Sequence, residues 1–194
     1  MTKQPNVVMI ITDQQRADTM ACYGNSVIKT PNLILLAEES FVFENAYVSQ
    51  PICTPSRSTL MTGLYPHATG CVRNNLPLDQ DVETIAELAP SGYLTAYYGK
   101  WHLGDEVKRQ RGFDEWLSCE DQYRKYYTED SLLDDLSDYH HYLVNKGYVP
   151  DLEDMGEQTF SREFAANLPI EDSRAMYLAD RTSDFISANK DRPF

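Results

Sequence analysis

The sequence predicts an α/β fold in which a mostly parallel sheet is flanked by helices. Two short apolar runs, at 7–11 and 93–98, each end in a polar motif. Continuous runs of this length, rich in β-branched or aromatic residues, are typical of strands that are buried on both faces of a parallel sheet. Segments with helical spacing, at 30–39 and 82–88, lie between the two runs.

The composition is ordinary for a globular protein, with 42% hydrophobic and 24% charged residues in a chain of 194. The four cysteines form no C-x-x-C pair. The first residues do not resemble a signal peptide, and no apolar run approaches the ~20 residues that span a membrane. We therefore expect a soluble, cytoplasmic protein without disulfides.

The net charge is strongly negative. Lys and Arg total 17 and Asp and Glu total 30, which gives a formal net charge of −13. A field of this sign disfavours nucleic acid and anionic membrane surfaces as partners. The acidic residues concentrate after Asp105, away from the motifs described below. An anionic substrate would need a local cationic pocket, possibly with a metal, to override this field.

Polar side chains follow the first predicted strand directly. Asp13 and Gln14 stand just after the run at 7–11, and ligands of open α/β sheets bind at the carboxyl ends of strands. Oxygen atoms of this kind suit a hard divalent cation. On the residues alone, the cap of a turn is the more common role for such an aspartate, and the metal role of Asp13 depends on the motifs described below. A helix at 30–39 and a second strand at 40–48 are predicted to follow.

The segment after the second strand carries the main motif. The extended run ends at Pro51, and a helix is predicted to begin near Thr54 and Pro55, because Pro suits the first helical position and Thr caps orphan N–H groups. Cys53 then lies at a helix N-terminus, which favours an anion. Arg57 follows one turn later and has a planar fork of donors for the same anion. The alternative is a buried structural cysteine.

Two polar stretches with weaker signals follow. His67 lies in a turn-rich loop at 63–70, where a structural histidine is as compatible as a catalytic one. Asn74 and Asn75 follow, and either suits a turn.

The strand at 93–98 delivers a second motif, Gly-Lys-Trp-His-Leu-Gly at 99–104. Strict alternation along an extended chain would place Lys100 and His102 on the same face. An ammonium and an imidazole in that position can neutralise an anion or protonate a leaving group.

The remaining chain is less informative. The stretch at 117–168 is acidic and rich in Tyr, and we expect a helical insertion there. Its Asp134-Asp135 and His140-His141 pairs are expected to point in different directions and not to share a metal. A final helix is predicted after Ser173.

These motifs together resemble one known family. They are Pro-Asn-Val-Val-Met-Ile-Ile-Thr-Asp-Gln at 5–14, Cys-Thr-Pro-Ser-Arg at 53–57, Gly-Leu-Tyr-Pro-His at 63–67, Gly-Lys-Trp-His-Leu-Gly at 99–104 and Gly-Phe-Asp-Glu-Trp at 112–116. The chain resembles the type I, formylglycine-dependent sulfatases of the alkaline phosphatase-like superfamily. The resemblance covers only the front part of the family's catalytic domain, so residues 1–194 are expected to be an N-terminal portion of one, with the insertion at 117–168.

The resemblance implies a function and a catalytic set. Sulfatases hydrolyse sulfate monoesters, and their motif cysteine, here Cys53, is oxidised to formylglycine. The family pattern makes Arg57, Lys100 and His102 the residues that stabilise negative charge. Relatives place an Asn near this position that hydrogen-bonds the substrate or the nucleophile, and Asn74 is favoured over Asn75 for that role. His67 is a second candidate for substrate binding.

The resemblance also implies cofactors and partners. Asp13 and Gln14, with the modified Cys53, are expected to bind a divalent cation. Calcium is favoured, and magnesium or manganese are possible. The implied partners are a formylglycine-generating enzyme and a small-molecule or sugar sulfate ester. Relatives supply further metal ligands, a second Lys and a second His from later strands, which this chain does not contain.

Two alternatives stay open from the sequence. Phosphonate monoester and phosphodiester hydrolases of the same superfamily share the Asp-Gln pair and the cysteine motif. The chain alone is also compatible with an inactive truncated piece or a binding relative.

Overall fold

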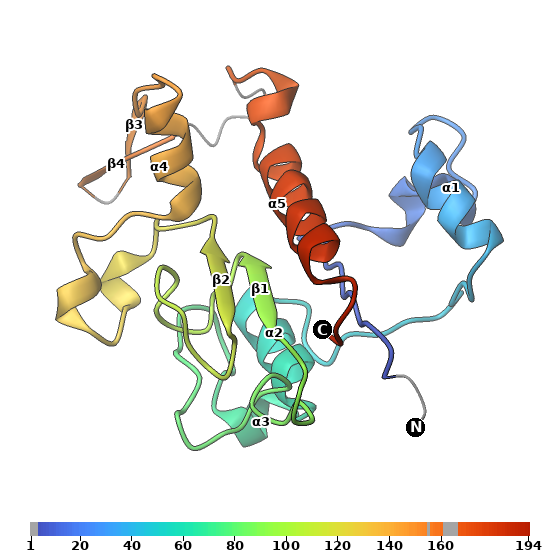
Figure 1. Ribbon diagram of the computed structural model, residues 1–194, viewed down its shortest axis with the longest axis horizontal. Helices are drawn as coiled ribbons and strands as arrows, with labels where there is room; N and C mark the ends of the chain where they lie inside the picture. The colour runs from blue at the N-terminus through green and yellow to red at the C-terminus, as the bar shows by residue number, and fades with distance from the viewer. Residues whose placement is uncertain (1–3, 155, 161–166) are drawn as a thin grey trace. The chain divides into compact units, whose positions relative to one another are not determined.

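The computed structural model describes residues 4–154, 156–160 and 167–194, and Figure 1 shows the order of the elements. The chain divides into two compact units. One unit is Val8–Val48, and the other is Ser49–Phe194 together with the residues up to Val7. Each unit is described by itself below.

The unit Val8–Val48 contains one α-helix and two short 3-10 helices. These are η1 (Ala17–Thr19), η2 (Ala21–Tyr23) and α1 (Pro31–Glu38). Pro31 takes the first helical position, where its missing N–H costs nothing. The hydroxyl of Thr30 accepts a hydrogen bond of 3.0 Å from the Ala21 amide and ties η2 to the start of α1. The predicted helix at 30–39 is confirmed.

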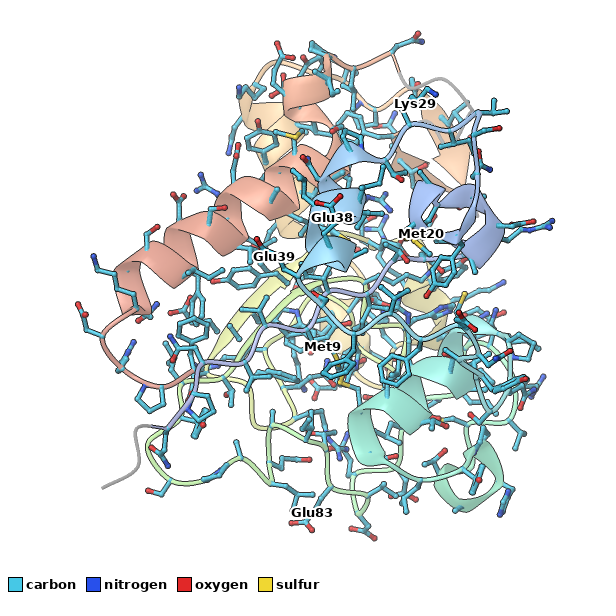
Figure 2. The ribbon with its side chains drawn as sticks, turned by 90° about the vertical axis from the view of Figure 1, so that its right-hand side faces the viewer. Met9, Met20, Lys29, Glu38, Glu39 and Glu83 are labelled. Carbon is cyan, nitrogen blue, oxygen red and sulfur yellow. The ribbon has the colours of Figure 1, made fainter. Side chains whose placement is uncertain are left out.

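The predicted first strand at 7–11 is not formed. The Val7 amide donates to the carbonyl of Phe194 at 2.8 Å, but no backbone hydrogen bond joins 8–11 to another described segment. Ile10 is 84% exposed, and Figure 2 shows the chain at Met9 as an extended trace without an arrow. A strand requires a neighbour, and periodicity alone does not supply one.

The predicted second strand at 40–48 is wrong for the same reason. No backbone hydrogen bond joins 41–48 to another described segment. Phe41 is 96% and Tyr47 is 91% exposed. The apolar character of this run is real, but its pairing partner is not among the described residues.

The larger unit contains a pair of parallel strands; the sequence predicts the first of them, at 93–98, but not the second. Strand β1 (Ala96–Gly99) pairs in parallel with β2 (Glu115–Ser118), with Tyr97 opposite Trp116. Figure 1 shows the two strands side by side. The polar motif at 99–104 begins where β1 ends, and helices pack on both strands, α5 on β1 and α4 on β2. An α/β fold with parallel strands is confirmed, although the sheet itself has two strands in this unit.

Four α-helices belong to the larger unit. They are α2 (Cys53–Thr62), α3 (Pro66–Thr69), α4 (Asp138–Asn145) and α5 (Arg174–Asn189). The hydroxyl of Ser173 caps α5 by accepting from the Met176 amide, as the sequence predicts. A helix at 82–88 is not formed, because its amides bind elsewhere: Thr84 N donates to the Glu87 carboxylate and Ile85 N to the Met61 carbonyl.

The stretch at 117–168 is only partly helical. It contains α4 and the 3-10 helices η3 (Arg124–Tyr126) and η4 (Asp130–Leu132). It also contains an antiparallel hairpin of β3 (Leu152–Asp154) and β4 (Glu157–Thr159), which the prediction of a helical insertion missed. The further 3-10 helix η5 (Ile170–Asp172) precedes α5.

The His140-His141 pair lies on α4, where His140 is buried and His141 exposed, so these two side chains face different directions as expected. Asp134 and Asp135 lie outside the helices, and both are exposed. No helix among the described residues is both long and apolar enough to cross a bilayer.

The core beneath the motif is small and aromatic. Its buried members are Met61, Cys71, Leu78, Trp101 and Leu103. Trp101 is fully buried, and its ring lies edge-on to Tyr97 at 5.1 Å and to Trp116 at 5.3 Å. Burial of an indole of this size contributes roughly 2–3 kcal/mol of hydrophobic stabilisation. The anchored Trp101 therefore fixes the middle of the Lys-Trp-His segment.

Candidate active site

Cys53 is the first residue of α2, so its side chain lies at a helix N-terminus, as the sequence predicts. The expected cap differs. Ile52 is the N-cap and makes no side-chain cap bond, and Pro55 is the third helical residue instead of the first. The Asn74 side-chain oxygen accepts from the Thr54 amide at 3.0 Å and takes the role of the cap from another segment. The amides at this terminus favour an anion beside Cys53.

Thr54 joins three segments at this terminus. Its hydroxyl donates to the His102 carbonyl at 2.8 Å and accepts from the Asn75 amide at 3.2 Å. The residue is fully buried. One side chain therefore holds the N-terminus of α2, the loop at 74–75 and the end of the second motif together.

Lys100 approaches Cys53 closely. Its Nζ lies 4.0 Å from the Cys53 Sγ. The same Nζ lies 3.7 Å from the Glu120 Oε2, and the other oxygen of Glu120 binds Arg174 at 2.7 Å. Lys100 and Glu120 are both largely buried, so the ammonium is held between the thiol and a carboxylate. Screening by solvent is weak for such a pair.

The guanidinium of Arg57 donates hydrogen bonds to other protein groups. Its Nη1 donates to the Lys100 carbonyl at 2.5 Å and to the Tyr97 hydroxyl at 3.3 Å. Tyr97 also donates to the Lys100 carbonyl. Burial is the main cause that raises the pKa of Tyr97, so the phenol stays neutral. These contacts make Arg57 a support for the backbone of Lys100. Direct contact between Arg57 and an anion stays a prediction.

His102 reaches the site through a turn and not through strand alternation. Strand β1 ends at Gly99, and His102 has a left-handed φ of 56°. Its Nε2 lies 2.6 Å from the Asn75 side-chain oxygen. Its ring stacks on Tyr123, with centroids 4.9 Å apart and planes 3° apart. The expectation that Lys100 and His102 share a strand face is therefore wrong in its geometry, because neither residue lies in the strand.

Glu106 holds the backbone of this turn. Its Oε2 accepts from the Trp101 amide at 2.8 Å and its Oε1 accepts from the His102 amide at 2.5 Å. The residue is 1% exposed. Burial raises the pKa of Glu106 to about 8, and the two amide hydrogen bonds oppose that rise.

Two predicted site residues lie apart from this cluster or in another role. His67 is exposed on α3, and its ring stacks on Tyr65 at 5.8 Å. No contact that we find joins His67 to Cys53. Of the two asparagines, Asn74 caps α2 and Asn75 binds His102.

The proposed metal ligands are divided between the two units. Asp13 and Gln14 belong to Val8–Val48 and Cys53 to the larger unit. Gln14 has a left-handed φ of 56°, a conformation that costs an ordinary residue roughly 1–2 kcal/mol. Across the ranges that the structure describes, no three His, Cys, Asp or Glu side chains are grouped to hold a metal ion. The described residues therefore do not by themselves fit a complete divalent-metal site.

Glu106 and Glu120 were missed from the sequence, and two other residues of the cluster have roles that the sequence did not predict: Thr54, expected as a helix cap, and Asn75, expected as the less favoured of the two asparagines. Each acts across at least one loop, and only spatial contact reveals it. Glu106 alone left a signal, because a carboxylate two residues beyond the apolar end of the second motif is out of place in a buried segment.

Comparison with protein families matches this chain to one family model. The model described as Sulfatase matches residues 5–194. An ulvan-active sulfatase from Formosa agariphila is 41% identical over 140 residues, which cover 66% of this chain and 27% of the relative. An N-acetylglucosamine-6-O-sulfatase from Bacteroides thetaiotaomicron is 35% identical over 154 residues, which cover 78% of this chain and 26% of the relative.

Solved structures show the same relationship. A protein crystallised with D-glucosamine-2-N,6-O-disulfate is 36% identical, with a TM-score of 0.55 over 59% of this chain and 23% of that one. The phosphonate monoester hydrolase of Silicibacter pomeroyi is 25% identical, with a TM-score of 0.69 over 96% of this chain and 39% of that one. The fold is therefore that of the sulfatase and alkaline phosphatase-like proteins. The chain spans about a quarter of the length of the curated relatives named above, and it belongs to the sulfatase family.

Proposed function

We propose that the protein to which this chain belongs hydrolyses sulfate monoesters at Cys53. The observation that carries the proposal is the placement of Cys53 at the N-terminus of α2 with the Lys100 Nζ 4.0 Å from its sulfur. A helix N-terminus and an ammonium both favour an anionic group at that point. The membership of the sulfatase family supports sulfate as the anion.

The side chains have distinct roles in this proposal. In the family, Cys53 would be converted to formylglycine, whose hydrate supplies the hydroxyl that attacks sulfur. Lys100 offsets the negative charge that develops on the transferred sulfate. His102 is oriented by Asn75, which leaves the imidazole in a fixed position to stabilise charge or to protonate the departing alcohol. Arg57 and Tyr97 hold the backbone from which Lys100 projects.

The proposal also includes a bound divalent cation. The sulfatase family implies a divalent cation, and Asp13 and Gln14 supply oxygen atoms of the kind that calcium prefers. Because these two residues do not complete a site, we propose that the remaining ligands come from outside the described residues. Calcium is preferred over magnesium and manganese by resemblance alone.

We also propose that residues 1–194 form the front part of a longer catalytic domain. The coverage of about a quarter of the curated relatives supports this. On this view residues 1–194 alone neither bind the cation tightly nor turn over substrate.

The substrate proposed is a sulfated sugar. The relatives named above are an ulvan-active sulfatase and an N-acetylglucosamine-6-O-sulfatase, and one solved relative was crystallised with a glucosamine disulfate. A phosphonate monoester is the second candidate, because a phosphonate monoester hydrolase shares the fold over 96% of this chain. A formylglycine-generating enzyme is the proposed partner, and a cytoplasmic setting stays a prediction from the sequence.

The test compares esters on the full-length protein, produced in cells that contain a formylglycine-generating enzyme. We expect hydrolysis of 4-nitrophenyl sulfate and of N-acetylglucosamine 6-sulfate, with little hydrolysis of a phenyl phosphonate monoester. Cys53→Ala should abolish turnover. Cys22→Ala is the matched control, since Cys22 is also a partly buried free thiol but lies in the other unit. Faster hydrolysis of the phosphonate ester, or turnover by Cys53→Ala, would overturn the proposal.

A further inference from the structure

A buried carboxylate grips the backbone of the second motif. The two oxygens of Glu106 accept from consecutive amides, those of Trp101 and His102, at 2.8 and 2.5 Å. Glu106 is 1% exposed, although carboxylates are seldom fully buried without such partners. Both acceptor atoms of one side chain are thus committed to the segment that carries Lys100 and His102.

The segment needs this support because it has no regular structure. It lies beyond the end of β1, so no strand ladder satisfies the two amides. His102 is in the left-handed region with φ 56°, which costs a residue with a Cβ roughly 1–2 kcal/mol. The free energy contributed by two charge-assisted hydrogen bonds is large enough to offset that conformational cost.

Glu106 is itself fixed in place. The Trp116 Nε1 donates to the Glu106 carbonyl at 2.9 Å, so its backbone is tied to β2. On the other side of the motif, Arg57 and Tyr97 hold the Lys100 carbonyl. The backbone of Lys100, Trp101 and His102 is therefore held at three points: the Lys100 carbonyl, the Trp101 amide and the His102 amide.

We propose that Glu106 is a positioning residue: its carboxylate fixes the turn that sets Lys100 beside Cys53 and His102 beside Asn75. This inference rests on the proposed function, because positioning matters only if these side chains act on an ester. The contacts of the Glu106 carboxylate with the motif are made to the amides of Trp101 and His102, so it acts through the backbone of its neighbours.

Four groups set the ionisation of Glu106 besides its own burial. The pKa of Glu106 is raised to about 8, mainly by burial; Glu120 adds to the rise, while the amides of Trp101 and His102 and the charge of Arg57 oppose it. Tyr97, Cys119 and Tyr127 also face Glu106, and its charge raises their pKa values. Glu106→Gln keeps one acceptor oxygen and the shape of the protonated acid, so it resembles the enzyme at low pH.

The experiment compares Glu106→Gln with a matched control in the full-length protein. Asp105→Asn is that control: Asp105 is 3% exposed and accepts from the amide and hydroxyl of Thr128, each at 2.6 Å, but it binds no part of the motif. We would measure KM, and kcat normalised to the fraction of molecules that carry the aldehyde at position 53. We would also measure the hydrogen exchange of the Trp101 and His102 amides by mass spectrometry.

At pH 9, where Glu106 is ionised, a positioning role predicts that Glu106→Gln lowers kcat by about tenfold or more and changes KM by less than about threefold. The two amides should exchange at least about tenfold faster, since one of their acceptors is gone. Asp105→Asn should keep kcat within about twofold of wild type even where its thermal stability falls. The ratio of wild-type to Glu106→Gln kcat should grow from pH 6 to pH 9, as Glu106 ionises.

Two results would overturn the inference. The first is a Glu106→Gln variant with wild-type kcat and wild-type amide protection. The second is an equal loss of kcat in Asp105→Asn, which would indicate general destabilisation. If Glu106→Gln cannot be purified, slow exchange of the Trp101 and His102 amides in wild type is still required. A wild type that hydrolyses no ester refutes the proposed function, while amide exchange still decides whether Glu106 holds the turn.

Discussion

Thr54→Val removes the hydroxyl that joins three segments and leaves the volume of the side chain almost unchanged. The Thr54 hydroxyl donates to the His102 carbonyl and accepts from the Asn75 amide. Both groups would be left without this partner in a site where Thr54 is fully buried. A buried polar group without a partner costs about 1–3 kcal/mol, and the half-buried Asn75 would recover part of that from water. We therefore expect a loss of about 2–4 kcal/mol in the free energy of unfolding.

The same substitution elsewhere supplies the control. Thr84 is also fully buried, and its hydroxyl makes one hydrogen bond of 2.9 Å, to the Arg111 carbonyl. Thr84→Val should cost about half as much as Thr54→Val, because one group is orphaned and not two. It should leave kcat unchanged, since Arg111 lies outside the cluster around Cys53.

The assay pairs urea unfolding of the full-length protein with kcat on 4-nitrophenyl sulfate. Thr54→Val should lower kcat by about tenfold to a hundredfold, because His102 and Asn75 shift relative to α2. Equal stability losses for Thr54→Val and Thr84→Val, with kcat unchanged in both, would refute the view that Thr54 assembles the site.

Three further predictions concern neighbouring groups. Asn75→Gly keeps the left-handed backbone of Asn75, which has φ 65°, but removes the oxygen on His102; the pH profile of kcat/KM should shift, and an unchanged profile would contradict the pairing. Asn74→Ala removes the cap on α2 and should lower the free energy of unfolding by about 1 kcal/mol. An unchanged free energy of unfolding in urea would argue against the cap. Because burial holds the pKa of Glu106 near 8, above its ordinary value, the folded state binds the extra proton; stability should fall as pH rises from about 4.5 to 8 and level off above it, and Glu106→Gln should remove that slope.

The sequence was sufficient for the parts of the site that are local. The helix after Cys53, the helix at 30–39, the cap at Ser173 and the strand that delivers Lys100 all follow from patterns within about fifteen residues. The motifs also bring Cys53 and Lys100 close together, as the resemblance implies.

The rest depends on contacts between distant segments. The runs at 7–11 and 41–48 are apolar enough for buried strands, but a strand forms only where another backbone is available, and Val7 alone finds one. The segment at 82–88 has helical spacing, yet Thr84 and Ile85 give their amides to a side chain and to another segment. No periodicity encodes such partners.

The site shows the same limit at the level of single residues. Strict alternation predicts a shared face for Lys100 and His102, but the turn at His102 breaks it. Glu106 and Asn75 owe their roles to that turn, so neither is visible before the turn is known. The catalytic roles of Cys53, Arg57, Lys100 and His102 stay predictions. So do the substrate-binding roles of Asn74 and His67.

The central claim is that Cys53 is the precursor of the nucleophile, and the state of its side chain tests it most directly. Trypsin releases residues 30–57 as one peptide, and its mass in protein from the native source reports what Cys53 has become. We predict loss of the sulfur and an aldehyde at position 53. An intact thiol in that peptide would contradict the account, and the contacts around Cys53 would then describe a structural helix N-terminus.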